Sequence, residues 1–222
     1  MNYLLIKRAA DILVSFSMLI VFAPILAVTA IIIRLTSPGP VFFRQTRFGK
    51  NRQPFTILKF RTMVHQAALT DQPEITAADD QRITPFGKIL RATKLDEFPQ
   101  LINVLNGQMS FVGPRPNVRK FVENYKDEEL KVFEIPQGVT DFASLWFREQ
   151  ERILVKSGTG DAEKDYREFV EPDKKRLQLK YSQEIGFATD LKIFVATILA
   201  ITFKINPIWC FPKSAREPLI KI

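Results

Sequence analysis

The chain has 222 residues and 46% hydrophobic content, which allows one domain with a core and additional apolar surface. Cys210 is the single cysteine and His65 the single histidine, which excludes a disulfide framework, Ser–His–Asp or Cys–His catalysis, and metal clusters built from these residues. The net charge is +8, and residues 1–62 hold this whole excess, because their only acid is Asp11. Basic residues beside an apolar segment suit anionic lipid headgroups and phosphorylated substrates.

The first predicted element is an uncharged apolar segment, residues 12–33. As one helix it would be about 33 Å long, enough to cross a bilayer. However, Pro24, in the middle of the segment, lacks a backbone N–H donor and disfavours a straight helix. Basic residues flank both ends of the segment, which favours a cytoplasmic location for both ends. We therefore predict a re-entrant helix–break–helix over residues 1–36, bent at Ala23 and Pro24. A single-pass anchor is the alternative, and a cleaved signal peptide is excluded because the apolar stretch is too long.

A β-hairpin is predicted next. The turn Ser37-Pro38-Gly39-Pro40 closes the membrane segment. Two β-prone runs, 41–45 and 55–60, flank a turn at 49–51. The polar stretch 65–80 lacks periodicity, so we expect a mobile loop there.

The remainder of the chain is predicted to be helical. Apolar residues at helical spacing predict a helix over 86–94 and another that begins near Pro99 and ends at Gly107. Two charged, exposed helices are expected at 121–132 and 163–185. The apolar segment 191–205 is short for a membrane span, so it is either a buried terminal helix or an interfacial one.

Together these elements predict an α+β, mainly helical fold with one small hairpin and catalytic helices at the membrane interface. We divide it into a membrane segment (1–36), a cytosolic catalytic domain (37–190) and a C-terminal interfacial helix with its tail (191–222). No internal repeat is present.

Four clusters of side chains suit the handling of a phosphate ester, because three supply cations and one supplies paired acids. They are Lys59-Phe60-Arg61-Thr62-Met63, Arg91, Asp96-Glu97 and Pro114-Arg115-Pro116. P-loop, dinucleotide-binding, zinc and nucleophile-elbow motifs are not found in the sequence.

Asp96 and Glu97 precede Pro99, and proline is tolerated in the first turn of a helix. We therefore place the pair near a helix N-terminus, where the helix dipole favours the ionised form of a carboxylate. One carboxylate can then attack phosphorus while the other holds a divalent cation. The alternative is that both residues only cap the helix.

The cationic residues have simpler alternatives too. The two flanking prolines hold Arg115 stiffly, and a fixed guanidinium suits a diphosphate, but a solvated turn would look the same. Lys59 could be an ordinary outward-facing strand residue, and Arg91 a solvated helix residue.

The order and spacing of these motifs from Lys7 to Pro116 resemble the bacterial sugar transferase family, the monotopic phosphoglycosyl transferases that start assembly of lipid-linked glycans. The stretches that carry the resemblance are Lys7-Arg8 with Asp11, Ser37-Pro38-Gly39-Pro40 to Arg47, Lys59-Phe60-Arg61-Thr62-Met63, Arg82-Ile83-Thr84 to Leu90-Arg91, Leu95-Asp96-Glu97-Phe98-Pro99-Gln100, Asn103-Val104-Leu105, and Met109-Ser110-Phe111-Val112-Gly113-Pro114-Arg115-Pro116.

The resemblance implies a catalytic domain on the cytoplasmic face of the bacterial inner membrane, a UDP-sugar donor and a polyprenyl (undecaprenyl) phosphate acceptor. It also implies that Asp96 attacks the sugar-bearing phosphorus, expels UMP and forms an aspartyl phosphosugar. Glu97 would hold Mg²⁺, and Lys59, Arg91 and Arg115 would neutralise phosphates. Membrane lipids are expected partners and nucleic acid is not; a homo-oligomer stays open.

The chain departs from the family pattern at Gln108, where Asp is usual, and through 137–148. There, Gln137-Gly138-Val139-Thr140-Asp141 stands for the usual Pro-Gly-Ile-Thr-Gly. This region is expected to shape the sugar or nucleotide pocket, so we predict no particular sugar. A non-enzymatic scaffold that binds anionic lipid is the second hypothesis, and a basic nucleic-acid binder the third.

Overall fold

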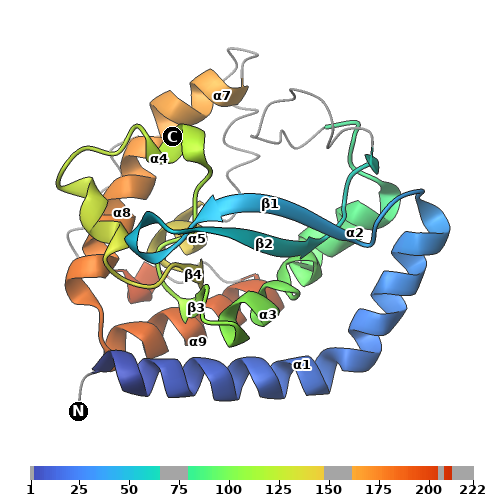
Figure 1. The fold of residues 1–222 in the computed structure, drawn as a ribbon, viewed down its shortest axis with the longest axis horizontal. Coiled ribbons are helices and arrows are strands. Elements are labelled where there is room, and N and C mark those ends of the chain that lie inside the picture. Colours follow the sequence, from blue (N-terminus) through green and yellow to red (C-terminus); the bar gives the residue numbers. More distant parts are fainter. Residues whose placement is uncertain (1–2, 66–79, 148–161, 205–207, 212–222) are drawn as a thin grey trace.

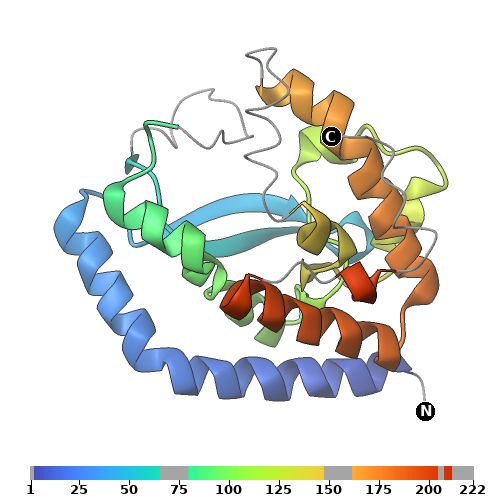
Figure 2. The same cartoon turned by 180° about the vertical axis from the view of Figure 1, so that it is seen from behind.

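The computed structural model describes residues 3–65, 80–147, 162–204 and 208–211. Helices predominate in these residues, accompanied by two small two-stranded sheets, so the predicted mainly helical α+β class is confirmed. Figures 1 and 2 show the long N-terminal helix α1 (Tyr3–Thr36) along one edge, with the other elements packed on one side of it. Most of the loop predicted at 65–80 lies outside the described residues.

Helix α1 is helical throughout, with Pro24 inside it, so the predicted break in the helix is wrong. A bend was predicted together with the break, and α1 is bent sharply, as Figure 1 shows; proline is the usual cause of such a kink because it removes one intrahelical hydrogen bond without ending the helix. Within the described residues, α1 is the one helix long and apolar enough to cross a membrane, judged by length and composition. Large apolar side chains remain exposed along it, among them Leu13, Phe16, Val21, Val28 and Ile31.

Polar contacts fix the first half of α1 to the rest of the molecule. Arg8 donates to the carbonyl oxygens of Val104 (2.5 Å) and Leu105 (2.7 Å), which are end carbonyls of the helix α3 (Gln100–Leu105). The Asp11 carboxylate accepts from the Ser110 hydroxyl at 2.7 Å and from the Phe111 backbone N–H at 3.0 Å. Arg8, in the basic flank of the membrane segment, therefore anchors α1 to α3 in addition to carrying a positive charge.

The predicted hairpin is confirmed. Strands β1 (Phe42–Phe48) and β2 (Pro54–Phe60) pair antiparallel with Phe42 opposite Phe60, and a 3-10 turn, η1 (Lys50–Arg52), joins them. Arg61, which directly follows β2, connects the end of that strand to the turn before β1, because its guanidinium donates to the carbonyl oxygens of Ser37 (2.6 Å) and Pro38 (2.8 Å). A second, parallel pair, β3 (Ser110–Val112) and β4 (Gly138–Thr140), was not predicted, because each strand is only three residues long.

The single helix predicted over 121–132 is wrong. The chain instead forms α4 (Arg119–Val122) and a 3-10 helix, η4 (Glu129–Phe133). These pieces are not mainly exposed either, because Val122, Tyr125, Val132 and Phe133 bury their side chains in a small cluster. The rings of Tyr125 and Phe133 lie 5.1 Å apart, much closer than eight residues of a straight helix would place them, so the chain folds back between them.

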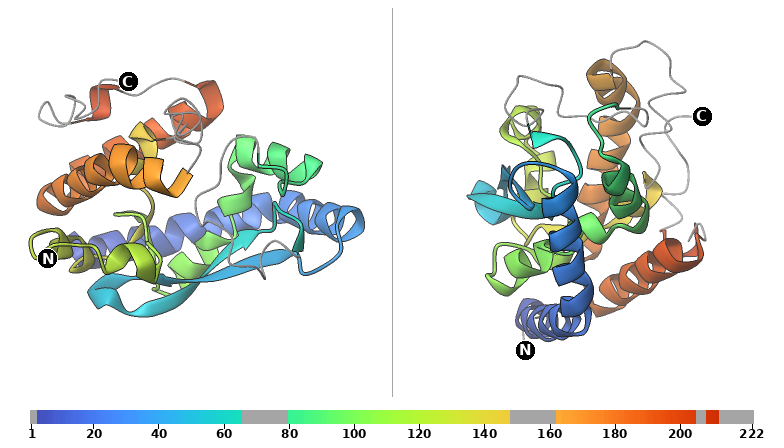
Figure 3. Two further views of the ribbon diagram at one scale, coloured as in Figure 1. Left: turned by 90° about the horizontal axis from the view of Figure 1, so that it is seen from above. Right: turned by 90° about the vertical axis from the view of Figure 1, so that its right-hand side faces the viewer.

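The C-terminal part is helical as predicted, in four successive pieces and one final turn. They are α7 (Ala162–Asp165), the π-helical η5 (Tyr166–Val170), α8 (Glu171–Glu184), α9 (Phe187–Phe203) and η6 (Ile208–Cys210). Figure 3 shows α8 and α9 on the side of the molecule opposite the hairpin. They are not simply exposed, because Leu177, Tyr181, Ile193 and Ala196 lie in the largest apolar core.

Asp190 joins three helices and should contribute strongly to stability. Its carboxylate pairs with Lys7 at 2.5 Å and accepts from the hydroxyls of Tyr3 and Tyr181, each at 2.6 Å. Breaking a buried ion pair costs about 3 kcal/mol, so we expect Asp190→Asn to lower the unfolding temperature in detergent by roughly 6–12 °C. Differential scanning fluorimetry measures this. Asp127→Asn, at an exposed position, is the control, and an equal effect of both changes would contradict the anchoring role.

Candidate active site

The paired acids lie in a short 3-10 turn, η3 (Leu95–Glu97), between α2 (Pro85–Thr93) and α3. Lys94 adopts the left-handed conformation (φ 58°), which ends α2 and turns the chain. Asn103 then fixes α3 against the hairpin, because its amide accepts from the Leu58 N–H at 3.0 Å and donates to the Thr56 carbonyl at 2.7 Å. These contacts bring η3 next to β2, where Lys59 follows Leu58.

Glu97 is the centre of a cluster of three charged side chains. Lys59 Nζ lies 3.0 Å from Glu97 Oε1, and Arg115 Nη1 donates to Glu97 Oε2 at 3.1 Å. Arg115 Nη2 also donates to Glu97 Oε1, so the guanidinium grips the carboxylate with two nitrogens. The three residues come from β2, η3 and the segment after β3, so the structure brings together three of the residues that the sequence proposed for the site.

The environment sets the charge of these groups. Burial acts to raise the pKa of Glu97, but Arg115 and Lys59 outweigh it and hold that pKa well below its ordinary value. Burial lowers the pKa of Lys59, and Glu97 opposes this shift. The Glu97 carboxylate is therefore ionised and lies between two cations, Lys59 and Arg115, which also interact electrostatically with the neighbouring Asp96.

Asp96 has a different environment from its neighbour. It is 8% exposed, and among the described residues its Oδ1 has no hydrogen-bond partner. Burial, and then the Glu97 charge, raise the pKa of Asp96 to about 6. We expected the helix dipole to favour the ionised form, and this expectation is wrong, because burial and a neighbouring like charge dominate. Neither acid caps a helix, since η3 and α3 have no side-chain cap.

The two carboxyls should therefore titrate separately in the magnesium-free protein. Below about pH 6 Asp96 binds a proton, and above it Asp96 is ionised, while Glu97 stays ionised across the same range. Carboxyl ¹³C shifts in detergent micelles, assigned by loss of the signal in Asp96→Asn, measure both transitions. An Asp96 midpoint near 4, the ordinary value for aspartate, would contradict the proposed effect of burial.

Arg91 approaches the site from α2. Its Nε donates to the Thr62 hydroxyl at 3.0 Å, and its charge acts to lower the pKa of Asp96. The structure thus brings Arg91 near the acidic pair but attaches it to Thr62, in the segment that follows β2. Pro24 and Ala23, by contrast, lie in α1 and have no part in this cluster.

The acids suit a hard divalent cation that substrate helps to hold. Among the described residues there is no group of three His, Cys, Asp or Glu that could form a metal site of protein ligands alone. Mg²⁺ commonly uses only one or two carboxylates, together with waters and substrate phosphates. Glu97, the predicted ligand, could supply one such carboxylate beside the substrate phosphates, which leaves Asp96 Oδ1 outside the proposed metal site.

Sequence reasoning missed two residues that build the site, Asn103 and Asp141. Asn103 stood in a motif that was noted only as a resemblance, and Asp141 stood where the family pattern has glycine. Asp141 precedes α5 (Phe142–Trp146), is fully buried and accepts from the backbone N–H groups of Ser144 (2.6 Å) and Arg115 (3.3 Å). Long-range contacts of this kind leave no local pattern in the chain.

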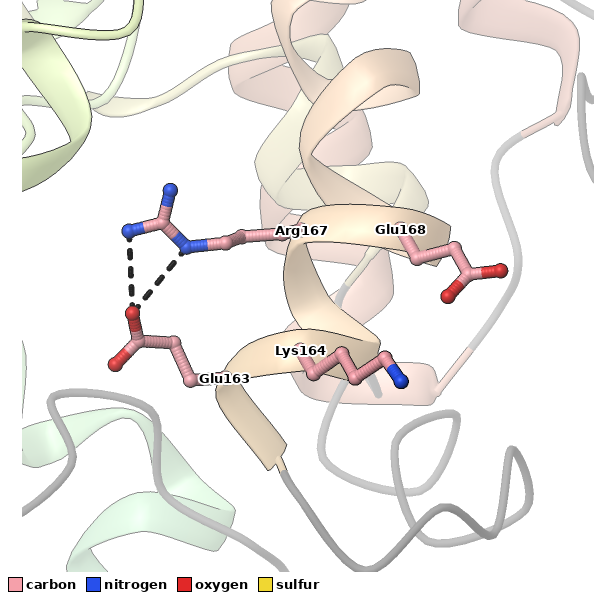
Figure 4. A pocket seen from close by; sticks show the side chains of 4 residues that line it. All are labelled: Glu163, Lys164, Arg167 and Glu168. Carbon is pink, nitrogen blue, oxygen red and sulfur yellow. Dashed lines mark hydrogen bonds and ion pairs between the residues drawn. The ribbon is translucent and has the colours of Figure 1, made fainter.

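A hollow outside this cluster lies on α7 and η5, lined by Glu163, Lys164, Arg167 and Glu168 (Figure 4). Arg167 Nε and Nη2 lie 3.2 and 3.1 Å from Glu163 Oε1, and Figure 4 shows the Lys164 and Glu168 side chains on the other side of the helix from this pair. Within this hollow, Glu163 and Arg167 are therefore paired with each other.

Comparison with known proteins places these observations in context. The family described as Bacterial sugar transferase matches residues 2–204. The chain is 35% identical over 203 residues to the UDP-glucose:undecaprenyl-phosphate glucose-1-phosphate transferase of Escherichia coli strain K12, and 38% identical over 199 residues to the protein of the same name from Caulobacter vibrioides. It is 43% identical over 144 residues to the UDP-N-acetylgalactosamine-undecaprenyl-phosphate N-acetylgalactosaminephosphotransferase of Aeromonas hydrophila.

These matches cover different shares of each protein. They include 87%, 86% and 65% of this chain, for the Escherichia, Caulobacter and Aeromonas proteins respectively. The same matches span 39%, 68% and 34% of the relatives' own lengths. The chain therefore spans little more than a third of the Escherichia and Aeromonas proteins.

Proposed function

Since this chain belongs to the bacterial sugar transferase family, we propose that it transfers a sugar 1-phosphate from a UDP-sugar to a polyprenyl phosphate, such as undecaprenyl phosphate. The observation that carries this proposal is the buried Asp96 carboxylate, one oxygen of which has no hydrogen-bond partner in the described part of the chain, next to the Glu97 carboxylate that Lys59 and Arg115 hold. This arrangement supplies one nucleophile and two fixed cations, which a phosphoryl transfer requires.

The proposed reaction has two steps. Asp96 Oδ1 attacks the phosphorus that bears the sugar; the bond from this phosphorus to the bridging oxygen breaks, and UMP leaves with that oxygen. The resulting aspartyl phosphosugar is then attacked by an oxygen of the polyprenyl phosphate, which restores the Asp96 carboxylate and yields a polyprenyl diphosphate sugar. The raised pKa of Asp96 fits a nucleophile, because a more basic carboxylate attacks phosphorus more readily.

Lys59 and Arg115 would stabilise the charge that develops on the phosphate oxygens, and Arg91 would assist from α2. Their positions before substrate arrives are set by Glu97, so little reorganisation is needed at the moment of reaction. We propose that Glu97 holds Mg²⁺, which would supply further neutralisation of the diphosphate when bound.

We propose that the catalytic domain lies on the cytoplasmic leaflet and that α1 enters and leaves the bilayer on that side. The exposed apolar side chains of α1 and its bend support this. Helix α9 supports an interfacial position as well, because Leu191, Val195 and Ile198 expose one apolar stripe while Ile193 and Ala196 are buried in the core. The site would then face a lipid-bound acceptor at the membrane surface.

The re-entrant arrangement predicts that both ends of α1 are on the cytoplasmic side. A protease-cleavable tag before Met1 should be protected in intact spheroplasts and cut only after lysis. Pro24→Leu restores the missing hydrogen bond and allows a straight helix of about 50 Å, so a fraction of its tags should become accessible from outside. Cleavage of the wild-type tag in intact spheroplasts would show a spanning helix instead.

The proposed activity is tested by incubating purified protein with a panel of UDP-sugars, Mg²⁺ and undecaprenyl phosphate, and measuring UMP. We expect UMP release that depends on one or a few of the sugars. The second candidate is a membrane-bound scaffold, which the departures from the family pattern at 137–148 keep open. Absence of UMP with every sugar, from protein that remains folded, would favour the scaffold.

A further inference from the structure

Arg115 is bound through its backbone as well as through its guanidinium. The side chain binds Glu97 and donates from Nη1 to the Val139 carbonyl at 2.9 Å. The backbone of the same residue has two additional partners, and both are completely buried side chains from other parts of the fold, Asp141 and Gln178.

Asp141 uses its two carboxylate oxygens for different purposes. Oδ1 accepts from the Ser144 N–H at 2.6 Å, which is the ordinary contact of a residue that caps the N-terminus of α5. Oδ2 accepts from the Arg115 N–H at 3.3 Å, across 26 positions of sequence. Serine would satisfy the first role, but it has no second oxygen to reach Arg115.

Gln178, on α8, holds the other side of the same residue. Its Nε2 donates to the Arg115 carbonyl at 3.3 Å, and its Oε1 accepts from the Tyr125 hydroxyl at 3.1 Å. That hydroxyl accepts from Asn117 Nδ2 at 2.7 Å, so a chain of buried hydrogen bonds fixes which way the Gln178 amide points.

We infer that Asp141 and Gln178 are positioning residues that hold the Arg115 backbone so that its guanidinium stays on Glu97. The inference rests on the proposed function, in which Arg115 neutralises phosphate. At 3.3 Å each hydrogen bond is long, so we expect the two bonds to add little to folding stability. Their effect is on the orientation of the Arg115 backbone. Pro114 and Pro116 stiffen the segment, and the two contacts set which way it faces.

The test compares Asp141→Ser and Gln178→Glu in full-length protein in detergent. Asp141→Ser keeps a cap for α5 but loses the contact to Arg115, and Gln178→Glu keeps the size of the side chain but replaces the donor by an acceptor. We expect each to lower kcat/KM for UMP release at least about tenfold and to weaken UDP binding, measured by calorimetry. Asp173→Ser, a buried aspartate of α8 that pairs with Arg176, is the control for loss of a buried carboxylate.

A double-mutant cycle shows whether the effect passes through Arg115. In the Arg115→Ala background, Asp141→Ser and Gln178→Glu should each lower kcat/KM for UMP release by a further factor of less than about two. Wild-type kinetics for both variants, or full additional losses in the Arg115→Ala background, would overturn the inference. If one variant shows no cooperative unfolding transition and is therefore not folded, the other variant still completes the cycle. Wild-type protein that neither releases UMP nor binds UDP would contradict the proposed function itself, and the inference with it.

Discussion

Asp96→Asn is expected to reduce the rate of UMP release by at least about 10³-fold, the scale of losing a covalent nucleophile. The amide has nearly the same size and is uncharged, so the buried position is filled while the attacking oxygen loses its negative charge. Burial already favours the neutral form of this side chain, which is why its pKa is raised to about 6. The variant should therefore fold at least as well as the wild type.

Two measurements make this result specific. Continuous detection of UMP gives the rate, and thermal unfolding in detergent shows that the variant is folded. Asp173→Asn is the matched control, since Asp173 is also buried (2% exposed) but lies on α8 and pairs with Arg176. Activity close to wild type in Asp96→Asn would place the nucleophile on another residue.

Glu97→Gln is expected to lower turnover by at least about 10²-fold and to weaken the dependence on Mg²⁺. The change removes the carboxylate that fixes Lys59 and Arg115 and removes a hard ligand for the proposed cation. UMP release is measured over a range of Mg²⁺ concentrations, and the variant should need a higher concentration for half-maximal rate.

The matched control for this change is Glu163→Gln. Glu163 also pairs with one lysine and one arginine, Lys120 at 2.6 Å and Arg167 at 3.1 Å, but on α7 at the hollow that Figure 4 shows. Its substitution should leave turnover unchanged. An unaltered magnesium dependence in Glu97→Gln would show that Glu97 does not bind the cation, whatever the effect of the change on the rate.

The local elements of the fold could be predicted where the sequence pattern is local. The hairpin, α2, α8 and α9 follow from β-prone runs or from helical spacing. The segment 121–132 could not be predicted, because its buried apolar residues fit a helix in sequence but pack as a folded-back cluster. The bend of α1 was predicted from Pro24, but the continuity of the helix was not, since proline can bend a helix as well as end it.

The candidate site was predictable as a set of charged residues, but its electrostatics were not. The sequence places Asp96 and Glu97 side by side near a helix N-terminus and allows them different tasks, but it predicts the ionised form from the helix dipole alone. The fold gives them different surroundings, because Lys59 and Arg115 bind Glu97 while Asp96 is buried and its Oδ1 has no partner among the residues that the structure describes. Asp190 and Asp141 show the same limit, since each joins segments far apart in the chain.

The central claim is a covalent bond between Asp96 and the sugar phosphate, and intact-protein mass spectrometry tests it most directly. Protein incubated with its UDP-sugar in the absence of polyprenyl phosphate should gain the mass of one sugar phosphate, and peptide mapping should place it on Asp96. Adding undecaprenyl phosphate should then discharge it. Rapid UMP formation from an enzyme whose mass never changes, or an adduct mapped to a different residue, would contradict the account.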